Sequence, residues 1–170
     1  AELEAMQAAV AQAMEEGALG LSSSLIYVPD RFASTEELIA LARVAARYGG
    51  SYITHQRSEA DAVNESLDEV FRIAREAGVP AIVHHIKTAY TQNWGRMPAV
   101  LRRFEQARIE GLDVAADLYP YTAGSNPLAA SLPSALQPAT TVLELPTMAA
   151  ASERLRLVEL KAVDAAYPLL

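Results

Sequence analysis

The spacing of apolar residues changes along the chain between two patterns, one typical of amphipathic helices and one typical of short buried strands. Helical spacing covers four segments, each followed by a glycine that can end a helix: residues 2–16, 35–48, 59–77 and 98–110. Short apolar runs lie between them, at residues 18–25, 51–54, 81–83 and 112–116. Ser34 and Glu37 have the spacing of a capping box, which marks the start of the second helix. The pattern therefore predicts βα units that repeat along the chain.

The predicted strands end near Ser24, His55, His85 and Asp117, at intervals of roughly thirty residues, the length of one βα unit. Right-handed crossovers place such strands parallel and side by side, so the polar residues that follow them share one edge of the sheet. An open doubly wound sheet and a closed barrel both bind ligands at that edge, and the period does not separate them. The sequence contains neither GxGxxG nor GxxxxGK[ST], which argues against a nucleotide site.

All three histidines lie at the ends of predicted strands, His55 after one strand and His84 and His85 after the next. Metal-dependent barrel enzymes carry zinc ligands at such positions because successive strand ends open on one mouth. Adjacent strand residues point to opposite faces, so we expect only one of His84 and His85 to face the mouth. We expect this to be His85, with Lys87 pointing the same way. On spacing alone, a pair of hydrogen-bonded rim histidines stays open as the alternative to a metal site.

Composition narrows the set of partners. The chain has 21 acidic and 14 basic residues, a formal charge of −7, and no stripe of Lys and Arg, so nucleic acid is not an expected partner. It has no cysteine, and therefore no disulfide and no thiolate ligand. No basic leader is visible, and no apolar run approaches the ~20 residues that span a bilayer. We expect no membrane association and, by default, a cytoplasmic location.

Five stretches together resemble the middle of the N-acyl-D-amino-acid deacylases, the D-aminoacylase branch of the amidohydrolase superfamily. They are GALGLSSSLIYVPDRFASTEELIALARVAARYGG, THQRSE, VHHIK, NWGRMP and ADLYPYTAG. The resemblance covers roughly residues 1–130 and implies an α/β fold, a partial (β/α)8 TIM-type barrel with about four of its eight βα units. We accordingly assign residues 1–136 to the central part of a barrel domain and residues 137–170 to a divergent tail. The tail is helix-compatible from Ala149 to Ala166.

The resemblance also implies a function and a set of site residues. Members of this family use Zn²⁺ to cleave the amide bond of N-acyl-D-amino acids, giving a carboxylate and a D-amino acid. The motif positions imply His55 and His85 as metal ligands, and Lys87, Tyr119 and Ser125 as groups that bind the substrate carboxylate. The family's His-x-His pair, cysteine ligand and proton-shuttle aspartate have no counterpart here, so we expect no catalytic residue in this chain and no activity of the chain alone.

Two other functions stay open at this point. One is a cyclic-amide hydrolase of the dihydroorotase or hydantoinase type. The other is a non-catalytic half-barrel that self-associates through open strand edges and serves as an interaction protein. A doubly wound domain for a small ligand is a third, weaker alternative.

Three further polar residues lie close to the ends of the predicted strands. Glu59 is expected to lie in the acidic first turn of a helix capped by Ser58, with no role in the site. Asp117 is expected to brace a loop rather than to act as a general base. Gln56 stands where relatives usually carry an aliphatic residue, and it is expected to alter the ligand geometry slightly.

Overall fold

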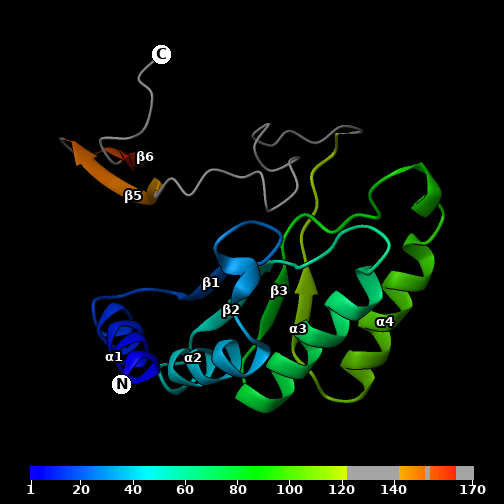
Figure 1. Cartoon of the computed structure of the whole chain (residues 1–170), viewed down its shortest axis with the longest axis horizontal. Helices are drawn as coiled ribbons and strands as arrows, with labels where there is room; N and C mark the ends of the chain where they lie inside the picture. Colours follow the sequence, from blue (N-terminus) through cyan, green and yellow to red (C-terminus); the bar gives the residue numbers. More distant parts are fainter. Residues whose placement is uncertain (122–141, 152–153, 164–170) are drawn as a thin grey trace. The chain divides into compact units, whose positions relative to one another are not determined.

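The computed structural model describes residues 1–121 in full and residues 142–151 and 154–163 as backbone. Two compact units make up the chain, Ala1–Gly124 and Ser125–Leu170. The first unit alternates helices and strands along the chain (Figure 1). Its elements are α1 (Glu2–Glu15), β1 (Gly20–Ser24), η1 (Asp30–Phe32), α2 (Thr35–Arg47), β2 (Ser51–His55), α3 (Val63–Ala77), β3 (Ala81–Val83), η2 (Thr91–Asn93), α4 (Met97–Ile109) and β4 (Val114–Ala116). The predicted βα repeat is confirmed.

The four strands form one parallel sheet in the order β1-β2-β3-β4, which is also their order in the chain. Gly20 pairs with Ser51 at the start of the first ladder, and Ser24 pairs with His55 at its end. A doubly wound sheet reverses its strand order at a switch point, and these four strands show no such reversal. Consecutive order is the arrangement of a barrel wall. The topology therefore favours the barrel over the doubly wound alternative.

The two faces of the sheet differ in burial, and this difference locates the core. Tyr52 and Thr54 on β2 are fully buried, as is Val83 on β3, whereas Ile53 and Ile82 between them are only partly covered. Tyr52 and Val83 belong to a core cluster that also contains buried residues of α2, α3 and α4. Because neighbouring strand residues alternate between faces, the helices cover one face, and the other face is the more open one. Figure 1 shows α2, α3 and α4 following one another along the sheet.

The helix boundaries follow the sequence signals at two of the clearest positions. The Ser34 side chain accepts a hydrogen bond of 3.1 Å from the backbone N–H of Glu37, which caps the start of α2 as expected. At the end of α3, Gly78 has φ of 65° and ψ of 41°, the left-handed conformation that glycine adopts at no steric cost. Among the described residues no helix has both the length and the apolarity needed to cross a bilayer.

The described backbone of the second unit corrects one prediction. Instead of a helix over 149–166, β5 (Val142–Ala151) and β6 (Arg154–Val163) pair as antiparallel strands. Alanine, leucine, lysine and glutamate give this segment its helical propensity, but propensity is weak beside the pairing of two ten-residue strands. The boundary expected between residues 136 and 137 lies outside the described residues and stays a prediction.

Candidate metal centre

The ends of two neighbouring strands bring two histidines together. His55 is the last residue of β2, and His85 follows the end of β3 by two residues. Because β2 and β3 are parallel partners, the two imidazole rings meet at the same edge, with centroids 4.2 Å apart. This is the pairing that the sequence spacing predicts. His85 has a positive φ of 37°, an uncommon backbone conformation for a residue with a side chain and one that is frequent at functional sites.

His84 lies outside this pair and has a different partner. Its exposed ring makes a 2.6 Å contact between Nδ1 and the Oδ2 atom of Asp117. The other oxygen of Asp117 accepts a hydrogen bond from the backbone N–H of His85. Partial burial raises the pKa of Asp117, but the hydrogen bonds from His85 and His84 outweigh it and hold that pKa below its usual value. Asp117 therefore braces the loop after β3, as expected, and helps to hold the backbone of His85.

Glu59 is a site residue that the sequence interpretation missed. Helix α3 begins only at Val63, with Ala62 as its N-cap, so Glu59 lies in the loop before the helix rather than in its first turn. Its side chain is 11% exposed, and the carboxylate lies between the two strand ends. Oε1 is 3.5 Å from His55 Nε2 and 3.0 Å from His85 Nδ1. Glu59 follows His55 by four residues, and this spacing is the one sequence signal for a role in the site. The same spacing also fits the first turn of a helix, so the sequence does not decide between the two interpretations.

Lys87 contacts the same group of residues, which agrees with the prediction that it points the same way as His85. Its Nζ atom is 2.6 Å from Glu59 Oε1 and 2.7 Å from His85 Nδ1. The same ammonium lies 5.2 Å from the ring centroid of Tyr119, within the range of a cation–π contact. Tyr119 also approaches His85, with ring centroids 6.0 Å apart. Four of the five predicted site residues thus come together, and the fifth, Ser125, lies outside the described residues.

The electrostatics of the pair favour a neutral imidazole at His55. Burial lowers the pKa of His55 to about 4, and the charge of Glu59 only partly opposes this effect. The neighbouring His85, Lys87 and His84 lower that pKa further. A neutral imidazole has a free lone pair, which is the form that binds a metal ion.

An aromatic residue from the first strand–helix loop flanks the same site. The ring of Tyr27 is 5.0 Å from the ring of His55, in an edge-on arrangement. Burial, followed by the charge of Glu59, raises the pKa of the Tyr27 hydroxyl, so this group stays neutral beside the carboxylate. The loop between β1 and α2 therefore forms one wall of the candidate site.

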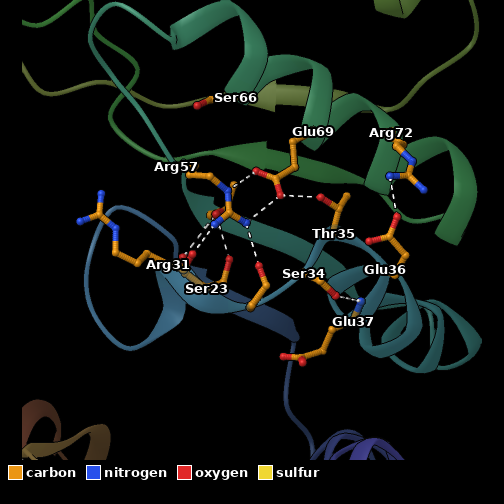
Figure 2. Close-up of polar contacts among 12 residues, drawn as sticks. Ser23, Arg31, Ser34, Thr35, Glu36, Glu37, Arg57, Ser66, Glu69 and Arg72 are labelled. Carbon is orange, nitrogen blue, oxygen red and sulfur yellow. Dashed lines mark hydrogen bonds and ion pairs between the residues drawn. The ribbon is translucent and has the colours of Figure 1, made fainter. Parts of the chain in front are cut away.

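An arginine clamp holds this loop against α3, as Figure 2 shows. The guanidinium of Arg57 donates two hydrogen bonds of 2.8 Å to the two carboxylate oxygens of Glu69. It also donates to the backbone carbonyl oxygens of Arg31 and Ala33, at 2.6 and 3.0 Å. Thr35 completes the arrangement by donating a 2.8 Å hydrogen bond to Glu69. Arg57 thus ties three segments together two residues beyond His55, and no described contact joins it to the histidine.

Gln56 is fully buried, although it follows a partly exposed histidine. Within the described part of the chain, neither polar atom of its carboxamide has a hydrogen-bond partner. Burying an unpaired amide costs free energy, so this residue is a local weak point next to the site.

The donor atoms present fit a zinc ion. His55, Glu59 and His85 each supply one nitrogen or oxygen atom, and these three atoms lie within 4.8 Å of one another. Two imidazoles and a carboxylate are a donor set that zinc takes in catalytic sites. The geometry therefore supports a metal centre at the carboxyl ends of β2 and β3.

Comparison with known proteins identifies the fold to which this site belongs. No model of a protein family matches the chain. A crystal structure of D-aminoacylase, described as defining a novel subset of amidohydrolases, is similar over 72% of this chain and 26% of its own, with 41% identity and a TM-score of 0.70. The chain belongs to the D-aminoacylase family of amidohydrolases. Its parallel sheet and helices are accordingly part of a TIM-type barrel.

Two further members of the D-aminoacylase family are similar at the same level. N-acyl-D-glutamate deacylase of Alcaligenes xylosoxydans xylosoxydans is 42% identical over 124 residues, which are 73% of this chain and 25% of the relative. The structure of N-acyl-D-glutamate deacylase from Bordetella bronchiseptica, in complex with zinc and a phosphonate mimic of the tetrahedral intermediate, matches 71% of this chain and 25% of its own, with 43% identity and a TM-score of 0.69. The chain thus spans about a quarter of the length of these relatives.

Proposed function

We propose that the chain supplies part of the active site of a zinc-dependent hydrolase that cleaves the amide bond of N-acyl-D-amino acids. The observation that carries this proposal is the meeting of His55 and His85 at neighbouring strand ends, with Lys87 beside them. The relatives that match this segment are deacylases of this substrate class. They favour the deacylase over the cyclic-amide hydrolase. We also propose that residues 1–136 correspond to a central part of the barrel domain.

In this proposal, His55 and His85 hold the zinc ion in part. A bound zinc ion polarises the amide carbonyl and lowers the pKa of a coordinated water to near 7. The described residues have separate tasks. His55 offers a neutral nitrogen because burial disfavours its protonation, and the loop held by Asp117 fixes the backbone of His85. In the same proposal, the proton is carried by an aspartate outside this chain, as the resemblance to the deacylase family implies.

The substrate carboxylate is bound, in the same proposal, by Lys87 and Tyr119, with Ser125 as a third group. Lys87 supports this role because its ammonium lies at the site, 26% exposed, beside the Tyr119 ring. A cation at the mouth attracts the one charged group that every N-acyl-amino acid carries. The proposed small-molecule partner is therefore an N-acyl amino acid with a free carboxylate. A cytoplasmic location stays a prediction.

A chimera tests the proposed function. Residues 1–130 of this chain replace the matching quarter of a D-aminoacylase, and the release of D-amino acid from N-acetyl-D-amino acids is measured. We expect the chimera to hydrolyse these substrates and not hydantoins. His55→Ala and His85→Ala are expected to abolish the activity, whereas His84→Ala, on the exposed neighbour, should leave most of it. Equal rates for the His85→Ala chimera and its parent would contradict the assignment.

A second proposal concerns association of the chain with itself. Within residues 1–121, β1 and β4 each pair along one side only, and the face that carries Ile53 and Ile82 is incompletely covered. Open edges of this kind pair readily with other strands. Analytical ultracentrifugation of the chain tests this: dimers or larger species are expected, and a monomer at all concentrations would contradict self-association.

A further inference from the structure

One oxygen of Glu59 has three nitrogen neighbours, and these contacts define a site for a cation. Oε1 lies 2.6 Å from the ammonium of Lys87, 3.0 Å from Nδ1 of His85 and 3.5 Å from Nε2 of His55. Glu59 and both histidines are largely buried, at 11%, 23% and 16% exposure. A carboxylate so far from water needs a positive partner. In this structure, that partner is Lys87.

The contact between Lys87 and His85 shows which way the lone pairs point. An ammonium group has three donor hydrogens and no lone pair, so it can only donate. At 2.7 Å, Nδ1 of His85 therefore accepts, and its lone pair points at the ammonium nitrogen. The Glu59 oxygen accepts from the same ammonium. Two lone pairs thus converge on one positive charge, which is also how ligands converge on a metal ion.

We propose that Glu59 is a third protein ligand of the metal centre, and that the ammonium of Lys87 holds the cation position until a metal ion displaces it. The proposal rests on the metal centre proposed above and goes beyond its two histidines. It couples two events: the metal ion neutralises Glu59, and Lys87 is released toward the substrate carboxylate. Substrate anion binding by Lys87 then depends on metal loading, because without metal the lysine is neutralised by Glu59.

Variants of Glu59 and Lys87 can distinguish a Glu59 that binds the metal from a Glu59 that only accepts hydrogen bonds beside it. In the simpler arrangement, Glu59 permanently accepts hydrogen bonds from His55 and Lys87 while the metal binds elsewhere on the rings. Loss of such an outer partner typically weakens metal binding by about 10–100-fold. The decisive difference is the sign of the Lys87 effect. A lysine that competes with the metal weakens metal binding, whereas a lysine that only supports the histidines strengthens it.

The experiment measures zinc affinity of the complete 170-residue chain by competition with a chromogenic chelator, and the absorption spectrum of the Co²⁺-loaded chain. The variants are Glu59→Gln, Glu59→Asp and Lys87→Met. Glu65→Gln is the matched control for the carboxylate, since Glu65 is exposed on α3. Arg72→Met is the control for the lost charge, because Arg72 lies on the outer side of α3 in an exposed ion pair. Circular dichroism establishes that each variant is folded, and Glu59→Asp keeps a carboxylate if the amide variant does not fold.

We expect Glu59→Gln to weaken zinc binding by more than about 100-fold, beyond the range of an outer partner, and to change the Co²⁺ spectrum. Lys87→Met should strengthen zinc binding by about tenfold, because a competing positive charge is gone. The two controls should match the parent. An unchanged Co²⁺ spectrum in Glu59→Gln, or weaker zinc binding in Lys87→Met, would overturn the proposal while leaving the histidine pair intact. Zinc binding that survives His55→Ala and His85→Ala would instead overturn the proposed metal centre itself.

Discussion

Replacing Arg57 by glutamine tests whether the arginine clamp stabilises the loop that flanks the site. The guanidinium makes two hydrogen bonds to Glu69 and two to the carbonyl oxygens of Arg31 and Ala33. A glutamine side chain is shorter and uncharged, and it cannot bridge a carboxylate and two carbonyl groups at once. The Arg57→Gln variant therefore leaves Glu69, which is 11% exposed, with Thr35 as its remaining described partner.

The size of the effect follows from burial. Removing one partner of a fully buried ion pair destabilises a protein by about 3–5 kcal/mol. Arg57 is 31% exposed, so water reaches part of the guanidinium and reduces the loss. We expect Arg57→Gln to lower the free energy of unfolding by about 2–3 kcal/mol. Arg57→Lys keeps the charge but loses the bidentate geometry, and it should lose about half as much.

Urea unfolding of the metal-free chain, followed by circular dichroism, measures this difference. Arg72→Gln is the matched control, since Arg72 also contacts two carboxylates, Glu36 and Glu76, but on the exposed side of α3. Figure 2 shows its contact with Glu36. The control should unfold at nearly the same urea concentration as the parent, because exposed ion pairs contribute little. If Arg57→Gln proves no more destabilising than Arg72→Gln, the clamp does not hold the loop and the reasoning from burial is wrong.

Three further predictions concern residues close to the site. Gln56→Met should raise the free energy of unfolding by about 1–2 kcal/mol, since it removes a buried amide without partners; a loss of stability in urea would contradict this. Gly20→Ala should destabilise the sheet by about 2–4 kcal/mol, because the new Cβ atom would lie 2.0 Å from the carbonyl oxygen of Ser51; an unchanged urea midpoint would refute the close approach. Burial lowers the pKa of His55 from 6.5 to about 4, so the unfolded chain takes up this proton first, and stability present above pH 6.5 is lost as the pH falls toward 4. After allowance for the solvent that still reaches the 16% exposed side chain, the loss should be about 1–2 kcal/mol, and His55→Gln should remove this part of the pH dependence in metal-free protein.

The histidine pair could be predicted from the sequence because it depends on short-range rules. Strand ends recur with the βα period, and parallel neighbours place those ends at one edge. His55 and His85 meet for this reason, and alternation along the chain correctly places Lys87 with His85. The same alternation predicts that His84 points away from His55 and His85, and its ring contacts Asp117 instead.

The residues that sequence reasoning missed depend on contacts between distant segments. Ser58 followed by Glu59 has the composition of a helix start, yet α3 begins at Val63 and Glu59 turns toward the histidines instead. The clamp of Arg57 on the β1–α2 loop joins positions more than twenty residues apart, for which a single sequence has no signal. The prediction of a helix over residues 149–166 is wrong for a related reason. Pairing of β5 with β6 overrides the helical propensity of this segment.

The zinc content of the purified chain is a direct measure of the proposed metal centre at His55 and His85. The parent and the variants His55→Ala, His85→Ala and His84→Ala are loaded with equal zinc, passed over a desalting column and analysed for metal per chain. We expect close to one zinc ion per chain in the parent and in His84→Ala, and little in the other two, because His55 and His85 share the proposed metal centre and His84 contacts Asp117 instead. Equal zinc in all four proteins would contradict a metal centre at the ends of β2 and β3.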